Sequence, residues 1–480
     1  MTDFHHPAPW QRFAAVALLS ASASLVACGG SSSSSSGPSF PPGAIMLDAN
    51  DLTESAKTAF ITASPGDVIV FPEGHFMIED TLTLDGVTSG LHNVTLRGYG
   101  RERTTLDFSG SVGGDGIYVQ NASDITIRDL TVIEANNNAI KLLGVDGIHI
   151  HHAGAEWRGD LTSDNGAYGL YPVESSNILI EHSYVRGSAD AGIYVGQSQN
   201  IVVRHNIAEE NVAGIEIENS SNADVYGNIA RHNTGGILIF DLPIGNGIYG
   251  STVRVFDNDI QSNNTDNFAN ESANPAGVHI VPPGTGVIVL STRDVEIYHN
   301  RIDDHDTTAV AITDYQIAGT PSADVITDGF RPTPRNIHIH DNEIGESGGD
   351  PRGLLIETIV APVFAMIGEG VPAILYDGLG EVLANQGFSA GLGEEAFAAD
   401  GSDNVCATDN GDISVGYLFD PADESALQFN EGEPVPRPAV DTGNGSSIFC
   451  TQPRLPASAA TINGVSYGCG EDDDGAACQL

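Results

Sequence analysis

The sequence predicts an all-β fold in which short strands stack as a parallel β-helix solenoid. Three observations carry this prediction. A unit with a period near 22 residues repeats along the middle of the chain, each unit alternates apolar and polar residues over short runs rich in Ile and Val, and an asparagine returns at the same place in successive units. Strands of this length stack about 4.8 Å apart, which pairs the backbone of each coil with that of the next.

The repeats are recognisable from about residue 93 to residue 356. Each unit has a polar residue, an apolar-x-apolar run, a turn and then Gly-Ile-x-apolar or a close variant. The glycines that begin the three clearest copies are 22 residues apart: Gly192, Gly214 and Gly236. Further copies begin at Gly116, Gly169 and Gly277. The Leu-x-x-Leu-x-Leu frame of a leucine-rich repeat is missing, so we favour stacked strands.

Two columns of turn residues accompany the repeat. The asparagine column consists of Asn206, Asn228, Asn258, Asn300 and Asn342. Stacked amides of this kind predict a hydrogen-bond ladder, at about 1 kcal/mol for each bond. The preceding position holds Asp129, His152, His182, His205, Asp257, His299 and Asp341. Imidazoles on adjacent coils stack in parallel and do not converge as metal ligands must, so we interpret this column as a turn and predict no metal site.

The N-terminal end of the repeat carries its own signals. Residues 52–62 are predicted to form an amphipathic helix that caps the open end of the solenoid, where exposed strand edges would otherwise aggregate. The following segment, Pro-Gly-Asp-Val-Ile-Val-Phe-Pro-Glu-Gly at 65–74, resembles the first coil of the right-handed parallel β-helix repeat proteins of the pectate-lyase-like superfamily. The resemblance covers about residues 45–356 and implies a right-handed β-helix, whereas a shared fold does not imply a shared function.

Residues 1–28 are predicted to be a targeting segment. The apolar run at 13–26 is too short to span a membrane comfortably. Leu-Val-Ala-Cys-Gly, which ends on Gly29, resembles a bacterial lipobox, and the resemblance implies export as a lipoprotein with Cys28 lipidated. A Ser/Gly/Pro tether follows at 29–44. We therefore expect a cell-envelope location, periplasmic or surface-exposed and anchored in the outer membrane by preference. An ordinary secretory signal with a chance cysteine is the alternative.

Charge and cysteine content restrict the partners and the compartment. The 480 residues include 64 Asp plus Glu against 19 Lys plus Arg, a formal net charge of -45. This argues against nucleic acid as a partner, because binding phosphates requires clustered cations. No cofactor is indicated with certainty, although calcium could bridge the acidic surface to an anionic glycan.

The four cysteines besides Cys28 are Cys406, Cys450, Cys469 and Cys478. In an exported chain an even number of cysteines predicts two disulfides, and the sequence leaves all three pairings open. The four cysteines lie within residues 357–480, which we predict to form an acidic C-terminal cap or appendage. A helix is expected in this region near residues 372–385.

The third residue of each Gly-Ile-x-apolar run is expected to point outward. Tyrosine rings stack on sugar faces and polar groups fix their orientation, so this stripe predicts a carbohydrate-binding surface. Its candidate binding residues, including neighbours just beyond the strands, are Tyr118, Tyr194, Gln197, Glu216, Glu218 and His279. An ordinary mixed strand face is the alternative.

One segment of this stripe adds a candidate reaction. The run Tyr-Gly-Leu-Tyr-Pro-Val-Glu at 168–174 resembles the Tyr-Gly-Phe-Asp-Pro-His-acidic motif of the mannuronan C5-epimerases. The resemblance implies an enzyme that acts on uronate polymers, a lyase or an epimerase. The family's Asp and His are replaced by Tyr171 and Val173, and Gln197 stands near the family's Arg, so proton abstraction would require other groups. The candidate catalytic residues are Lys141 as base or charge neutraliser, Tyr168 or Tyr171 as acid, and Glu174 as the orienting group.

Two functions of other classes stay open at the level of sequence. The first is a non-catalytic envelope rod that binds another protein, which the departures from the epimerase motif favour. The second is a metal-handling accessory protein, suggested by the histidine-containing turns, although the chain has only 4 Met residues and no Met-rich copper motif. The partner is accordingly a polysaccharide or an envelope protein.

Overall fold

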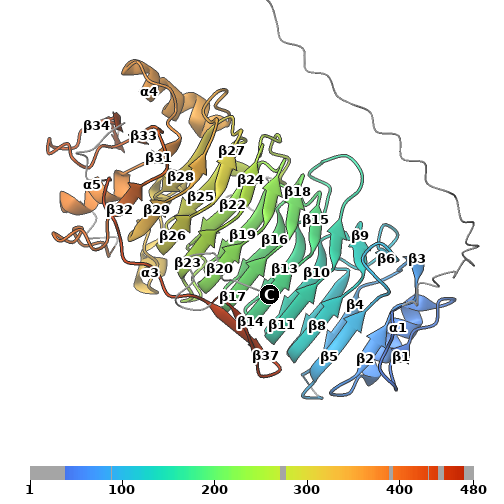
Figure 1. Ribbon diagram of the computed structural model, residues 1–480. Helices are drawn as coiled ribbons and strands as arrows, with labels where there is room; N and C mark the ends of the chain where they lie inside the picture. Colours follow the sequence, from blue (N-terminus) through green and yellow to red (C-terminus); the bar gives the residue numbers. More distant parts are fainter. Residues whose placement is uncertain are drawn as a thin grey trace, which may run out of the picture. The chain divides into compact units, whose positions relative to one another are not determined.

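The computed structural model describes residues 38–87, 89–270, 277–388, 393–430, 432–441 and 448–469. Residues 40–480 form one compact unit, which contains every described helix and strand. In this unit the chain winds through three sheets, and nearly every coil adds one strand to each sheet (Figure 1). The predicted parallel β-helix is confirmed. None of the described helices is long and apolar enough to cross a membrane.

Within each of the three sheets, which we call A, B and C, neighbouring strands are about three apart in the numbering because one turn of the solenoid separates them. Sheet A contains β1 (Ile45–Met46), β2 (Val68–Val70), β5 (His92–Arg97), β8 (Ser123–Arg128), β11 (Asp146–His151), β14 (Ser176–Glu181), β17 (Gln199–Arg204), β20 (Ser221–Tyr226), β23 (Ser251–Phe256), β26 (Arg293–Tyr298), β29 (Ile337–His340) and β32 (Val405–Thr408). Sheet B contains β3 (Gly74–Met77), β6 (Thr104–Asp107), β9 (Thr131–Ile133), β12 (Gly154–Glu156), β15 (Tyr184–Arg186), β18 (Ile207–Glu209), β21 (Ile229–Arg231), β24 (Asp259–Gln261), β27 (Arg301–Asp303) and β30 (Glu343–Ile344). Sheet C contains β4 (Leu82–Asp85), β7 (Ile117–Gln120), β10 (Asn138–Leu143), β13 (Tyr168–Val173), β16 (Ala191–Gly196), β19 (Ala213–Glu218), β22 (Gly235–Phe240), β25 (Thr285–Leu290), β28 (Thr308–Thr313), β31 (Ile374–Tyr376), β33 (Val415–Tyr417) and the antiparallel β36 (Ala439–Asp441).

The core consists of columns of inward-pointing aliphatic side chains. One such column in sheet A is Ile125, Ile148, Ile178, Ile201, Ala223, Val253, Val295 and Ile337, in register from strand to strand. All of these side chains are buried. Removing an apolar side chain from water contributes about 25 cal/mol for each Å² buried, so the repeated alternation is what holds the coils in register.

The asparagine column forms the predicted ladder, inside the bend that follows sheet A. Each side-chain amide donates to the amide oxygen of the next coil at 2.9–3.0 Å, from Asn206 through Asn228, Asn258, Asn300 and Asn342 to Asn410. The His/Asp column beside it has positive φ angles; Asp129 is at 57° and His152 at 50°. Asp, Asn and His adopt this left-handed conformation more readily than other residues with side chains, which explains their recurrence.

A helix covers the N-terminal end of the solenoid. At the N-terminal end, α1 (Leu52–Thr62) confirms the predicted cap and buries Ala56 and Phe60 against the first coils. The other helical elements are η1 (Val278–Ile280), α2 (Tyr315–Ala318), α3 (Ala323–Thr327), the π-helical η2 (Ile356–Val360), α4 (Ala361–Met366) and α5 (Leu379–Asn385). Only the last part of the helix expected near 372–385 forms, because residues 374–376 pair with sheet C as β31. Sheets A and C therefore continue beyond residue 356, through β31, β32 and β33.

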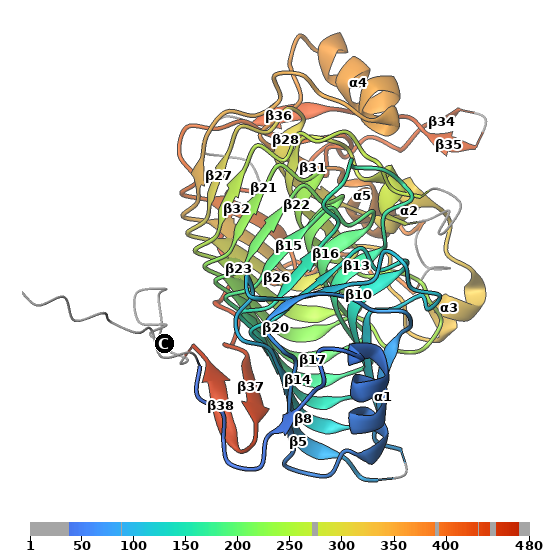
Figure 2. The ribbon, with the colours of Figure 1, turned by 90° about the vertical axis from the view of Figure 1, so that its right-hand side faces the viewer.

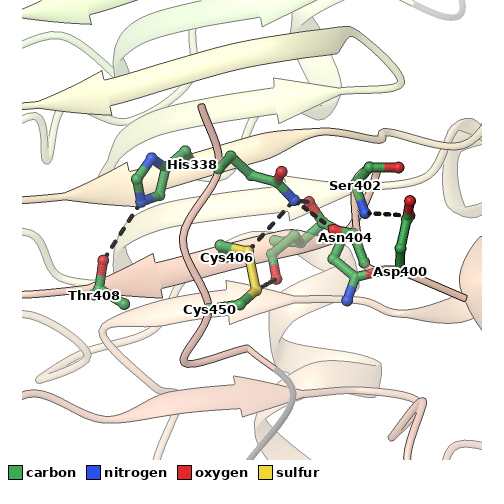
Figure 3. Close-up of a disulfide and its surroundings, with 10 residues drawn as sticks. His338, Asp400, Ser402, Asn404, Cys406, Thr408 and Cys450 are labelled. Atoms are coloured by element: carbon green, nitrogen blue, oxygen red, sulfur yellow. Dashed lines mark hydrogen bonds between the residues drawn. A yellow bond between two sulfur atoms is a disulfide. The ribbon is translucent and has the colours of Figure 1, made fainter. Parts of the chain in front are cut away.

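A disulfide links Cys406 of β32 to Cys450 (Figure 3). It confirms that cysteines of the C-terminal region pair, and such bonds form and persist in oxidising compartments, which indicates an extracytoplasmic protein. Cys469 is disulfide-bonded too. Cys28 and Cys478 lie outside the described residues, as does the proposed signal segment.

Beyond this disulfide, residues 450–469 form an arm that runs back over the outer face of sheet A and ends in the hairpin β37 (Ala459–Ile462) and β38 (Val465–Gly468) (Figure 2). Backbone N–H groups of the arm donate to side chains on coils far earlier in the chain, such as Ser458 to Asp224 at 3.2 Å and Thr461 to Asn177 at 3.2 Å. Its apolar side chains pack on an outward apolar row of sheet A that spans two neighbouring columns, with Leu179 and Val202 in one and Tyr226, Phe256 and Tyr298 in the other. The arm thus covers an apolar surface that water would otherwise contact.

We expect Ile462→Asp to detach the arm without unfolding the solenoid. Ile462 is buried against the apolar row, and a carboxylate there would be desolvated without a partner. Limited proteolysis should then cleave the arm about tenfold faster or more, while the circular dichroism of the sheets is unchanged. Val465→Asp is the matched control, because Val465 lies in the same hairpin and is 51% exposed. Equal protection of both variants would contradict the role assigned to this contact.

Candidate functional site

The outer face of sheet C changes character along the solenoid. One outward column carries Tyr118, Lys141 and Tyr171 on β7, β10 and β13, in register. On the next strands the same column holds Tyr194 and Glu216. From β22 onward it is apolar, with Leu238, Ile288, Ala311 and Leu375. Polar chemistry on this face is therefore concentrated between β7 and β19.

The first part of the column is partly accessible to solvent. The Lys141 ammonium nitrogen lies 5.4 Å from the ring centroid of Tyr118 and 5.3 Å from that of Tyr171. All three side chains are of intermediate exposure. A cation between two half-exposed aromatic rings presents both a stacking surface and a positive charge to a ligand.

Three tyrosines cluster where this surface meets the buried part of the column. The ring centroid of Tyr168 lies 4.4 Å from that of Tyr171 and 4.6 Å from that of Tyr194, and the Tyr171 and Tyr194 centroids are 5.1 Å apart. Burial raises the pKa of all three phenols, that of Tyr171 to about 12. They stay protonated at neutral pH and can donate hydrogen bonds or a proton.

Three carboxyl groups lie beneath the tyrosines. Glu218 accepts a hydrogen bond from the Gln197 amide at 3.1 Å, and the same amide nitrogen is 3.2 Å from the Tyr194 hydroxyl. Glu216 is 1% exposed, and its Oε2 atom has no hydrogen-bond partner. The third carboxyl belongs to Asp190, in the turn before β16, which hydrogen-bonds Tyr168. An unpartnered buried carboxyl oxygen is costly and therefore marks a place where a ligand can bind.

The pKa values of these groups are raised, mainly because burial disfavours the charged form. The pKa of Asp190 rises to about 7 and that of Glu218 to about 7, while that of Glu216 rises well above its ordinary value. The charges of Asp190 and Glu218 raise the pKa of Glu216 further. At neutral pH the site therefore contains both protonated and ionised carboxyl groups.

A cleft of about 280 Å³ lies beside this cluster and reaches it at Asp190. Asp190 lines the cleft, together with Asn137, two coils earlier, and with Val278 and His279 of η1. Asp190 is partly exposed, whereas Glu216 and Glu218 are buried behind it. A substrate in the cleft would thus meet the carboxyl group of Asp190 first.

The structure brings together most of the residues that the sequence singled out. Lys141 and Tyr118 flank Tyr171, and the remaining members form the buried cluster: Tyr168, Tyr194, Gln197, Glu216 and Glu218. Glu174 is exposed at the turn after β13 and has a φ angle of 50°.

The expected strand that begins at Gly277 is wrong. His279 lies in the 3-10 helix η1, and Thr285–Leu290 occupies the strand position instead, as β25. The two prolines at 282 and 283 explain the difference, since proline cannot donate to a strand ladder. His279 nevertheless lines the cleft beside Asp190.

Sequence reasoning missed Asp190. It precedes Ala-Gly-Ile, and the equivalent residues of the next two repeats are Val212 and Thr234, both buried. An acidic residue at a position that its neighbours bury is the signal that would have revealed it.

A second group of titratable residues lies on sheet A. Single ligand atoms of Glu296, His338 and His340 all lie within 4.8 Å of one another. Glu296 is already engaged, by His340 at 3.0 Å, by the Leu455 N–H of the arm at 3.1 Å and by the Arg454 guanidinium. Because a cation and a backbone donor occupy this carboxylate, the group fits arm docking better than metal binding.

Comparison with solved structures finds distant likenesses to several carbohydrate-active enzymes. The A-module of a mannuronan C-5 epimerase from Azotobacter vinelandii is 17% identical, with a TM-score of 0.39 over 64% of this chain and 87% of that chain. A hyperthermoactive exopolygalacturonase from Thermotoga maritima is 10% identical, with a TM-score of 0.45 over 65% and 83% of the two chains. The catalytic unit of an α-1,3-glucanase from Streptomyces thermodiastaticus is 15% identical, with a TM-score of 0.43 over 72% and 52%.

At these identities and TM-scores the likenesses carry no argument about function, and the fold rests on the strand pairing described above. No curated protein matches the sequence. Residues 102–253, from β6 to β23, match the family model described as the right handed beta helix region.

Proposed function

We propose that this protein cleaves a polysaccharide at the tyrosine-carboxyl cluster of sheet C, by general acid–base catalysis. The observation that carries the proposal is Glu216, a buried carboxyl with a free oxygen beneath aromatic rings and next to two further carboxyl groups. Titratable groups with raised pKa values in a cleft are typical of catalytic sites.

Glycoside hydrolysis requires one protonated and one ionised carboxyl group. Asp190, with a pKa of about 7 at the inner end of the cleft, is suited to protonate the leaving glycosidic oxygen. Glu218 is suited to accept the proton of the attacking water, whose oxygen then bonds to the anomeric carbon. Glu216 stays protonated at neutral pH and would donate a hydrogen bond to the sugar. The half-exposed rings of Tyr118 and Tyr171 would support adjacent sugar units.

The acidity of the cluster favours a neutral glycan over a uronate polymer, because like charges would repel a uronate. One observation favours the second candidate, a lyase or epimerase for uronate chains. Lys141 lies between Tyr118 and Tyr171, where it could neutralise a substrate carboxylate while a protonated tyrosine acts as the acid. Glu174 would then orient the substrate from the end of β13.

A turnover assay separates these reactions. The protein is incubated with neutral glucans and with polymers of mannuronate, guluronate and galacturonate, with and without calcium. New reducing ends without unsaturated sugar, on a neutral glucan, are the result we expect. Unsaturated ends or altered uronate stereochemistry would establish the second candidate in its place. Binding without turnover would overturn the catalytic proposal and leave a glycan-binding protein, whereas neither binding nor turnover would favour the alternative of a protein-binding rod.

For location we propose the cell envelope, with acyl chains on Cys28 as the anchor and the tether at 29–44 carrying the solenoid. The lipobox resemblance supports the anchor, and the Cys406–Cys450 disulfide supports an extracytoplasmic compartment.

A further inference from the structure

We infer that the apolar end of the sheet C face binds the acyl chain of an uncharged lipid. A cavity of about 120 Å³ lies over β25, β28 and β31, where the outward column consists of Ile288, Ala311 and Leu375. The η1 segment separates this cavity from the catalytic cleft. Val278 and His279 line the cleft, whereas Ile280 and Val281 line the cavity. The inference does not depend on the proposed function.

The cavity offers no free polar group to a ligand. Its wall is aliphatic or aromatic except for three threonines and Asp377. Each hydroxyl donates to a main-chain oxygen: Thr285 to Pro282 at 3.0 Å, Thr308 to Pro372 at 2.9 Å and Thr313 to Asp314 at 3.4 Å. The Asp377 carboxyl accepts from the N–H groups of Leu379 at 3.0 Å and Asp314 at 2.5 Å. Since apolar cavities of this size, up to roughly 150 Å³, stay dry and take up apolar guests, the occupant must be hydrocarbon.

The cavity continues outward, which makes the binding space long. Ile317, Leu355, Val360 and Leu418 line both the cavity and an adjoining open groove of about 900 Å³. The groove is also lined by Phe388 and Phe429, which are 55% and 48% exposed. Soluble proteins rarely expose large apolar side chains side by side without a ligand for them. A narrow inner end and a wider apolar outer end fit an extended chain whose polar end stays near the surface.

Charge selects the head group. Neither space is lined by Lys, Arg or His among the described residues, and the groove contains the carboxylate Glu433 beside the neutral Gln316, Thr320 and Thr358. A phosphate or a free carboxylate would lack a counter-charge there and would be repelled in a chain of net charge -45. Hydroxyl or ester groups can hydrogen-bond the amide and the hydroxyls at the mouth. The ligand class is therefore a neutral acyl lipid.

The test uses the purified full chain and fluorescence of N-phenyl-1-naphthylamine, a neutral apolar probe. We expect probe binding that monododecanoylglycerol displaces and dodecanoate displaces far less well. Leu355→Glu places a charge at the junction of the two spaces and should weaken probe binding about tenfold or more. Leu354→Glu is the matched control; Leu354 is 79% exposed, lines neither space and should bind the probe as the unmodified protein does.

Ala311→Phe, which fills the inner cavity, gives a second variant if Leu355→Glu alters the helix; it too should weaken binding of the probe. Equal displacement by dodecanoate and its glycerol ester would overturn the assignment of a neutral head group. Absence of displacement, or identical affinities in the Leu354 and Leu355 variants, would overturn the acyl site itself. Both results are independent of glycan turnover, so this inference and the proposed function fail separately.

Discussion

Glu216→Gln is expected to lower glycan turnover by about three orders of magnitude and, at the same time, to stabilise the folded chain at pH 8. In the proposed reaction the protonated Glu216 donates a hydrogen bond to the sugar, and loss of one such positioned donor typically costs roughly 10²–10³-fold in rate, which sets this scale at roughly 10³. The gain in stability has a separate cause. Burial raises the pKa of Glu216 well above 4.5, so at pH 8 the folded state must either keep a proton that the unfolded chain has released or bury a charge.

The pH dependence identifies this cause. Because the folded pKa is the higher one, the cost is absent below the unfolded value near 4.5 and grows as the pH rises. Asp190 and Glu218, with pKa values of about 7, add to the same decline between about pH 4 and pH 7. Urea unfolding of Glu216→Gln should give a free energy of unfolding close to that of the unmodified chain at pH 4, and a higher one at pH 8.

Glu102→Gln is the control for this variant. Glu102 has a side chain that is 86% exposed, so its replacement should change neither turnover nor the pH dependence of stability. Loss of stability at pH 8 on replacing Glu216 would show that its carboxyl makes a structural contact, and full activity of that variant would remove Glu216 from the proposed mechanism.

Asn258→Leu is expected to lower the free energy of unfolding by about 3–5 kcal/mol. Asn258 donates to the Val225 carbonyl at 2.9 Å and to the Asn300 amide oxygen at 2.9 Å, and it accepts two bonds from Asn228 at 3.0 Å. Leucine has a similar volume but leaves these buried groups without partners, at about 1–3 kcal/mol for each unsatisfied group.

Urea unfolding followed by circular dichroism measures this loss. Asn50→Leu is the matched control, because Asn50 is exposed and bonds only to nearby Asp48. A loss below about 1 kcal/mol for Asn258→Leu would mean that the ladder aligns the coils without stabilising them.

The fold can be predicted from the sequence because each coil repeats the same local pattern of apolar, polar and turn residues. The register of Ile201 or Val253 follows from alternation within a few residues, and the Asn206–Asn342 ladder follows from spacing alone. The segment that begins at Gly277 has the same residue pattern as a true repeat. Pro282 and Pro283 prevent it from forming a strand, because proline has no N–H to donate to the neighbouring strand. A search for periodicity does not detect this missing donor.

Features that depend on contacts between distant segments could not be predicted in this way. Asp190 matters because the fold places it near Glu218, on the next coil. The acyl cavity arises where η1, α2 and η2 approach sheet C, and no local pattern specifies their approach. The arm binds side chains such as Asp124, 339 residues before its partner Asn463.

That last contact also sets an order of events during folding. Each coil of a solenoid contacts mainly its neighbours, so the coils can fold one after another, beginning at the N-terminal end, while the chain is synthesised. The arm contains some of the last residues to emerge and contacts some of the earliest coils, so its loop-closure entropy is lost only when the rest has folded. Until then the row from Leu179 to Tyr298 faces solvent. Arm docking therefore follows the folding of the coils that the arm covers, and a chain that lacks the arm exposes an apolar surface that the folded protein covers.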